Sequence, residues 1–171
     1  VEGSRYVRFS NQIQFDAAGG NSLATELRTA VRTNQVELHY QPRVEASTGE
    51  LRGLEALLRW NHPEQGLLPP EHFVPLLEET GLIVPVGEWV LKTACAQNQA
   101  WQEQGLPPIR MSVNLSSRQF RAGNLVEPVV ASLAAARLNP RFLDVELTEG
   151  TLLSDLEETR RALERLREIG V

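Results

Sequence analysis

The chain has 171 residues, 42% hydrophobic and 23% charged, and a formal net charge of −5. This composition is typical of a globular domain, but a complete eightfold α/β barrel usually needs about 250 residues. The single cysteine, Cys95, excludes an intrachain disulfide and a zinc site built from cysteines, and the acidic balance argues against a DNA or RNA polymer as partner.

The sequence contains no apolar run of about 18 residues, so we expect no membrane-spanning helix and no membrane contact from this segment. Its first residues also lack the apolar stretch of a signal peptide. With the lone cysteine, these features favour a cytoplasmic location, whether or not a parent protein is anchored elsewhere in a membrane. The missing initiator methionine predicts that the chain is a piece of a longer protein.

Residues 1–21 show no clear periodicity and end in the loop-like AAGGN, so we expect a linker or the tail of an upstream domain. Apolar residues at helical spacing then predict a helix at about 22–34. Clean alternation predicts a strand at 36–46, and a second strand is expected at 51–60, directly after a short turn. Such a turn requires the two strands to be antiparallel, because a parallel crossover needs about a dozen residues.

The remainder alternates between helices and strands, which indicates an α/β fold with a mainly parallel sheet. We expect a Pro- and Gly-rich loop containing a surface-exposed His62, and then the following elements: helices at 71–80 and 86–104, a strand at 109–115, a helix at 124–137, a strand at 142–148, and a helix at 154–169 that starts with the capping box Ser154 and Glu157.

Each predicted strand has one polar face near its end, although a strand buried on both sides should be almost entirely apolar. The polar sets are His39 and Gln41; Glu55, Leu57 and Arg59; Ser112, Asn114 and Ser116; Asp144, Glu146 and Thr148. Such faces would converge inside a barrel, where a carboxylate is costly unless it is paired or bound to a metal. Glu55, Asn114 and Glu146 offer hard oxygen donors, which suit Mg²⁺ or Mn²⁺.

Simpler roles compete with this metal site. Glu55 could pair with Arg59, Asn114 could be a turn residue at the strand end, and Glu146 could pair with a basic residue that the sequence does not place. His39 fits a solvated imidazole better than a ligand. The coincidence of three oxygen donors on three strand ends favours the metal site.

At these residues the chain resembles the EAL domain, the family of cyclic di-GMP phosphodiesterases. Five blocks follow the family order across residues 22–171: LHYQP at 38–42, GLEALLRW at 53–60, FVPLLEETGLI at 73–83, SVNLS at 112–116 and ELTE at 146–149. The resemblance implies a TIM-like (β/α)8 barrel with an antiparallel first strand. This chain would supply about the first four strands, the N-terminal half of the domain.

The resemblance also implies how the site works. Glu55, Asn114 and Glu146 would bind metal, with Glu55 as a catalytic residue, and Gln41, Leu57 and Arg59 would contact the cyclic dinucleotide. Two Mg²⁺ or Mn²⁺ ions would activate a water that attacks phosphorus and yields linear pGpG. The family's next aspartate block would follow Val171, so we expect residues 1–171 alone to be inactive.

Further expectations concern partners. Residues 3–10 resemble the end of a GGDEF domain, so we expect an attached sensory or GGDEF domain, or a homodimer. Two alternatives to the hydrolase remain: a receptor that binds cyclic di-GMP without turnover, and a protein-interaction module. Intact Glu55, Asn114 and Glu146 favour the hydrolase, because a receptor has no need of metal ligands.

Overall fold

A computed structural model describes residues 17–121, 125–147 and 156–171 of the chain. The elements along the chain are α1 (Ala17–Arg32), β1 (Val36–Val44), β2 (Leu51–His62), β3 (Gly66–Leu68), η1 (Pro70–His72), α2 (Val74–Thr80), α3 (Ile83–Glu103), β4 (Arg110–Leu115), α4 (Ser117–Arg121), α5 (Val126–Ala136), η2 (Pro140–Phe142), β5 (Leu143–Leu147) and α7 (Leu156–Ile169). The predicted α/β class is therefore confirmed.

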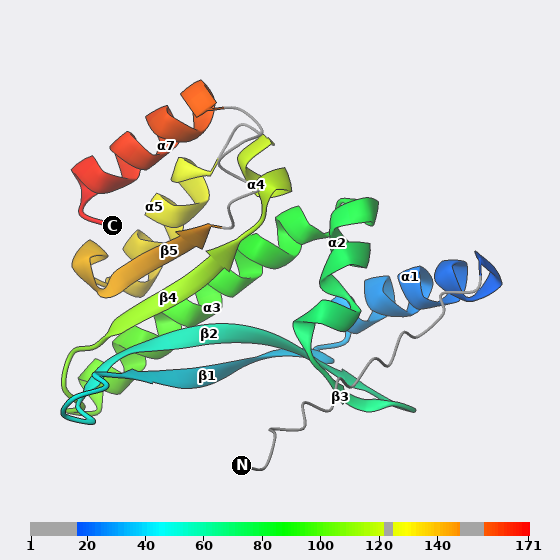
Figure 1. Cartoon of the computed structure of the whole chain (residues 1–171), viewed down its shortest axis with the longest axis horizontal. Coiled ribbons are helices and arrows are strands. Elements are labelled where there is room, and N and C mark those ends of the chain that lie inside the picture. The colour runs from blue at the N-terminus through cyan, green and yellow to red at the C-terminus, as the bar shows by residue number, and fades with distance from the viewer. Residues whose placement is uncertain (1–16, 122–124, 148–155) are drawn as a thin grey trace, which may run out of the picture.

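The strands form one curved, mixed sheet in the order β1-β2-β4-β5, with the short β3 paired to β2 (Figure 1). The first pair is antiparallel, as the short connection required, whereas β2–β4 and β4–β5 are parallel. The two parallel pairings are joined through helices, which is the only way in which such a chain can return to the same edge.

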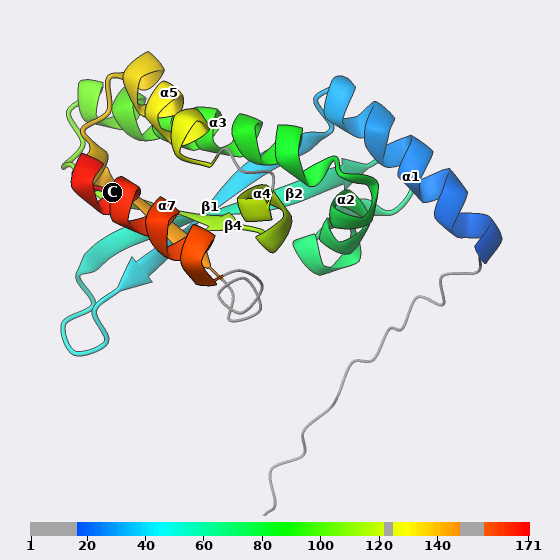
Figure 2. The same ribbon diagram turned by 90° about the horizontal axis from the view of Figure 1, so that it is seen from above.

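Helices α3 and α5 lie along one face of this sheet, as Figure 2 shows. The apolar residues of each strand turn to that face: Met111, Val113 and Leu115 of β4 are all buried. Tyr40 of β1 packs edge-on against Trp101 of α3, with ring centroids 4.9 Å apart. The alternate residues of each strand therefore occupy the opposite face, where the predicted polar sets lie.

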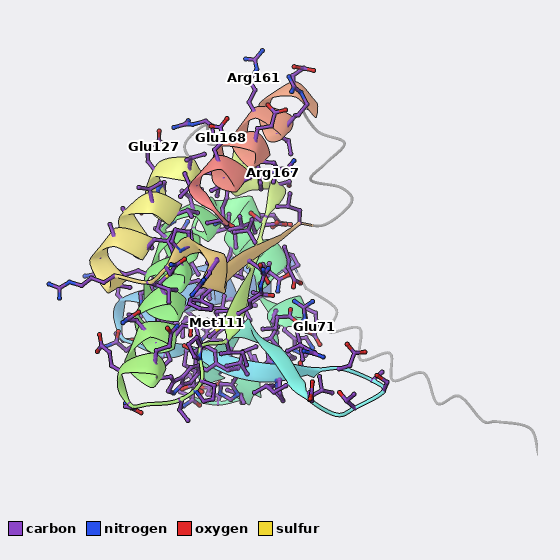
Figure 3. The ribbon with its side chains drawn as sticks, turned by 90° about the vertical axis from the view of Figure 1, so that its left-hand side faces the viewer. Glu71, Met111, Glu127, Arg161, Arg167 and Glu168 are labelled. Atoms are coloured by element: carbon purple, nitrogen blue, oxygen red, sulfur yellow. The ribbon has the colours of Figure 1, made fainter. Side chains whose placement is uncertain are left out.

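Figure 3 contrasts the two kinds of surroundings. Met111 is fully buried between the sheet and the helices, whereas Arg161 on α7 is exposed and projects outward (Figure 3). Arg160 pairs on the same helix with Glu157 at 3.3 Å and Glu164 at 2.5 Å. The charged run of α7 is a solvated face.

Several boundaries differ from the sequence prediction. Helix α1 begins at Ala17, so residues expected as a loop are helical. Strand β3 and helix α4 were not predicted, because three and five residues are too short to show a period. The predicted cap Ser154 and strand-end Thr148 lie outside the described residues.

Gly81 ends α2 as predicted, in the left-handed conformation (φ 77°) that favours glycine. Within the described part of the chain, no helix is both long and apolar enough to span a membrane.

Candidate functional site

Three predicted site residues lie on neighbouring strands of the polar face: Glu55 on β2, Asn114 on β4 and Glu146 on β5. The sheet register places Glu55 opposite Ser112, and Asn114 opposite Glu146. On the other side of β2, Gln41 of β1 lies directly opposite Glu55. Period-two alternation on each strand, combined with this register, brings the residues to one face.

Glu55 and Asn114 are in direct contact. The Asn114 side-chain amide donates a hydrogen bond from Nδ2 to Oε1 of Glu55 at 2.7 Å. The backbone pairing between β2 and β4 ends at Ala56 and Val113, so Asn114 lies one residue beyond it. The two side chains therefore meet diagonally at the end of the ladder.

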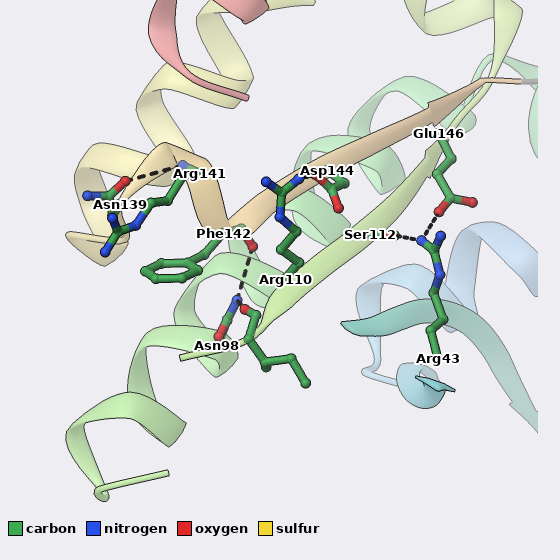
Figure 4. Close-up of polar contacts among 10 residues, drawn as sticks. Arg43, Asn98, Arg110, Ser112, Asn139, Arg141, Phe142, Asp144 and Glu146 are labelled. Atoms are coloured by element: carbon green, nitrogen blue, oxygen red, sulfur yellow. Dashed lines mark hydrogen bonds and ion pairs between the residues drawn. The ribbon is translucent and has the colours of Figure 1, made fainter. Parts of the chain in front are cut away.

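Glu146 has a different partner, Arg43 of β1, which the sequence analysis did not single out as a site residue. Arg43 Nη1 donates to Glu146 Oε1 at 2.5 Å and to Ser112 Oγ at 2.6 Å (Figure 4). The contact joins the first and last strands of the described sheet across its open face. Arg43 could have been found from the sequence, because alternation puts it on the same face of β1 as Gln41. The basic partner anticipated for Glu146 is thus Arg43.

The other simple alternatives are also resolved. Arg59 does not pair with Glu55; its Nη1 donates to the carbonyl of Leu58 at 2.9 Å. His39 Nε2 lies 2.9 Å from Glu37 Oε1, and both side chains are about half exposed, at 47% and 49%. The solvated imidazole expected for His39 matches this arrangement.

The predicted dinucleotide contacts Gln41, Leu57 and Arg59 lie along the same β1–β2 face. A cavity of about 560 Å³ lies between strands β2 and β4 and helices α2, α3 and α4; Leu57 and Asn114 contribute to its lining, together with Ala56, Leu58 and Leu115 of the helix-covered face. Its volume is in the range of small-molecule sites, about 300–1,000 Å³.

The donors at the strand ends are two carboxylates and one amide. Among the described residues, no group of three His, Cys, Asp or Glu side chains is placed to hold a metal ion. The set still fits a hard divalent cation, since amide and carboxylate oxygens are both accepted ligands of Mg²⁺.

His62 was expected at the surface, and this expectation is wrong, because its side chain is only 3% exposed. Its Nδ1 accepts hydrogen bonds from the backbone N–H groups of Glu64 and Gln65, at 3.1 and 3.2 Å, and its Nε2 lies 3.0 Å from Glu26 Oε2. These contacts close the turn between β2 and β3 and attach it to α1. The imidazole is a structural group on the last residue of β2, seven residues beyond Glu55.

Comparison with known proteins agrees with this geometry. Residues 24–171 match the model of the EAL domain. The chain belongs to the EAL domain family.

Two relatives come from Pseudomonas aeruginosa. The bifunctional diguanylate cyclase/cyclic di-GMP phosphodiesterase MucR is 42% identical over 97% of this chain and 24% of its own length. The cyclic di-GMP phosphodiesterase NbdA is 40% identical over 95% of the chain and 21% of its own length. The chain thus spans less than a quarter of the length of these relatives.

Solved structures share the fold. The PaMucR phosphodiesterase in complex with c-di-GMP aligns with a TM-score of 0.84 and 45% identity, over 88% of this chain and 61% of that one. The EAL enzyme Bd1971, bound to cAMP and cyclic di-GMP, aligns with a TM-score of 0.83 and 27% identity, over 90% of this chain and 43% of that one. The expected EAL-type α/β fold with its antiparallel first pair is confirmed.

Proposed function

We propose that this chain supplies the first part of a phosphodiesterase site that hydrolyses cyclic di-GMP to linear pGpG. The observation that carries the proposal is the contact of Glu55 with Asn114, which lies opposite Glu146, on three adjacent strands of an EAL domain. Relatives named as cyclic di-GMP phosphodiesterases, and a similar structure in complex with c-di-GMP, support it.

Glu55, Asn114 and Glu146 would hold Mg²⁺ or Mn²⁺, with two ions in the complete site. Such ions supply Lewis-acid stabilisation of the phosphodiester and lower the pKa of water at the site. Asn114 uses Nδ2 to orient Glu55, which leaves its own Oδ1 and the second oxygen of Glu55 available as ligands. The fixed rotamer of Glu55 reduces the entropy lost when it binds a cation.

Gln41, Leu57 and Arg59 would bind the dinucleotide. Gln41 lies opposite Glu55, so its amide can hydrogen bond to a ligand held beside that carboxylate. Leu57 offers apolar contact at the mouth of the cavity. Arg59 uses one of its five N–H groups on the Leu58 carbonyl and has no carboxylate partner among the described residues, so its charge remains available for a phosphate.

A second candidate is a receptor that binds cyclic di-GMP without hydrolysing it. The Arg43–Glu146 pair favours this candidate, because a guanidinium on Glu146 competes with a divalent ion for the same oxygen.

The proposal also includes a cytoplasmic location, and either a homodimer or an attached sensory or GGDEF domain. The word bifunctional in the name of MucR supports an additional domain.

The test is turnover of cyclic di-GMP by the full-length protein with Mg²⁺ or Mn²⁺, followed by chromatography of pGpG. Glu55→Gln preserves the shape of the side chain but removes its charge. We expect it to lower turnover about 1,000-fold or more, because a metal-polarised phosphodiester is worth several kcal/mol.

Glu50→Gln is the matched control, since Glu50 is an exposed carboxylate in the turn between β1 and β2 that pairs with Arg52. This variant should turn over like the wild type. Binding of cyclic di-GMP without turnover in either metal would overturn the hydrolase and establish the receptor. Neither binding nor turnover would reject both candidates.

A further inference from the structure

The turn that follows β4 is closed by a reciprocal pair of hydrogen bonds between Ser116 and Gln119. The backbone N–H of Ser116 donates to Gln119 Oε1 at 3.0 Å, and the backbone N–H of Gln119 is 3.4 Å from Ser116 Oγ. This is a capping box, in which the first and fourth residues satisfy each other's free N–H groups. It begins two residues after Asn114.

Gln119 is only 7% exposed, and it lies on a glycine of the neighbouring helix. A Cβ atom added to Gly87 of α3 would lie 1.9 Å from Gln119 Nε2 and 2.6 Å from its Cδ. Gly87 has an ordinary helical backbone, and a glycine inside a helix costs about 1 kcal/mol relative to alanine. The space it leaves for Gln119 explains why a glycine is used there.

The residue before Gln119 makes a second attachment. Arg118 Nη1 donates to the backbone carbonyl of Glu78, and it lies 3.4 Å from the carbonyl of Glu79, both near the end of α2. Helix α4 is therefore attached to α2 through Arg118 and to α3 through Gln119. These two helices pack on the sheet and provide a fixed support.

Asn114 needs such a support, because the ladder between β2 and β4 stops at Val113. On the side of Glu55, no backbone hydrogen bond of that ladder holds Asn114. The ladder with β5 holds Asn114 opposite Glu146, so on the side of Glu55 the position of its side chain depends on the path of the chain immediately after it. The capping box fixes that path.

We propose that Gln119, accommodated by Gly87, is a positioning residue that holds Asn114 against Glu55 and thereby prepares the metal site. The role of the metal rests on the proposed function, whereas the effect on Asn114 does not. Gln119 forms no hydrogen bond with Asn114 or Glu55. It acts through Ser116 and the two peptide units between Ser116 and Asn114. Support of metal ligands by neighbouring groups commonly alters metal affinity 10–100-fold.

Two variants of the full-length protein test separately the space that Gly87 leaves for Gln119 and the hydrogen bond that Gln119 accepts from Ser116. Gly87→Ala forces Gln119 out of its position. Gln119→Met fills a similar volume but cannot accept the hydrogen bond from Ser116. We expect each to weaken Mn²⁺ binding about tenfold in calorimetry, and to lower kcat more than it changes KM.

The double variant Gly87→Ala, Gln119→Met tests whether the two residues act as one unit. Met is flexible enough to move aside from the new Cβ, so the double variant should lose no more affinity than Gln119→Met alone. Additive losses would overturn the coupling of Gly87 to Gln119. Gln97→Met, on the same helix as Gly87, is the control and should bind Mn²⁺ like the wild type.

A readout independent of metal and activity is the NMR signal of the Asn114 side-chain amide in protein labelled with ¹⁵N-asparagine. Glu55→Ala removes the acceptor of the Asn114 hydrogen bond and provides the reference shift. The signal in Gly87→Ala and Gln119→Met should move toward that reference. An unmoved signal in folded variants would overturn the proposal. If the signal moves while the wild-type protein binds no Mn²⁺, the positioning role stands and the proposed function fails.

Discussion

The two ends of the β4–β5 pair carry polar groups of opposite character (Figure 4). Before the strands begin, fully buried Asn98 of α3 donates to the carbonyls of Ile109 and Phe142 at 3.0 and 3.2 Å. Toward the end of β5, Glu146 is 36% exposed and pairs with Arg43, which is 52% exposed. A neutral, satisfied and buried amide stabilises the fold, whereas an exposed charged pair can exchange its partner for a ligand.

This difference follows the general division of labour in α/β barrels. Side chains at the N-terminal ends of the strands contribute to stability, and those at the C-terminal ends form the site. Glu55 and Asn114 belong to the second group, and their side chains are in direct contact. Changes at the two ends should therefore separate stability from binding.

The largest effect on stability is expected for Asn98→Ala. The change leaves two buried carbonyls without their donor and opens a cavity, so the free energy of unfolding should fall by about 2–4 kcal/mol. Urea denaturation measures it. Gln99→Ala, next to it on α3 and bonded only to Glu103 on its own helix, should cost less than about 0.5 kcal/mol. Equal losses in the two variants would contradict the anchoring role of Asn98.

Arg59→Ala should affect binding and leave stability nearly unchanged. A charge-assisted contact to phosphate is worth about 1.5–3 kcal/mol, so the affinity for cyclic di-GMP should fall roughly 10–150-fold. Calorimetry with the full-length protein measures it. Arg110→Ala is a control at the opposite end of the sheet, where Arg110 pairs with Asp144 at 2.9 Å. An unchanged affinity for Arg59→Ala would remove this residue from the binding site.

A smaller effect is expected for Arg43→Gln, which frees Glu146. Exposed ion pairs contribute about 0.2–1 kcal/mol, so Mn²⁺ should bind up to about fivefold more tightly. Glu146→Gln alone should weaken Mn²⁺ binding and leave the guanidinium of Arg43 without its carboxylate. The double variant Arg43→Gln, Glu146→Gln removes this unpaired positive charge, so it should recover part of the lost affinity. Arg52→Gln, an exposed arginine of the same hairpin, should have no effect. Weaker binding by Arg43→Gln would show that Arg43 supports the site and does not compete for it.

No reaction is expected at Cys95 in the folded protein. Burial raises the pKa of its thiol to about 12, because the thiolate is poorly solvated there. The thiol should resist iodoacetamide at pH 8 and become reactive only when α3 detaches from the core. The same alkylation measurement verifies that each site variant is folded. Rapid alkylation of the wild-type protein would contradict the tight packing around α3.

Much of the fold follows from the sequence because its signals are local. The alternation in 36–44, 51–60 and 110–115 assigns each side chain to a face, and the short turn before Leu51 sets the antiparallel pair. Short elements escaped this reasoning: β3 depends on the side chain of His62 closing a turn, and α4 depends on the capping box of Ser116 and Gln119.

The sequence alone placed Glu55, Asn114 and Glu146 each on the polar face of its own strand, since alternation is a property of the extended backbone. The partners of these side chains were decided by tertiary structure. Arg43 and Glu146 are 103 positions apart, and only the order and register of the strands bring them within 2.5 Å. Likewise Gly87 gives no sign in its own helix of the side chain that it accommodates. Periodicity reports which way a residue points, and contacts between distant segments arise only when the sheet and its helices pack together.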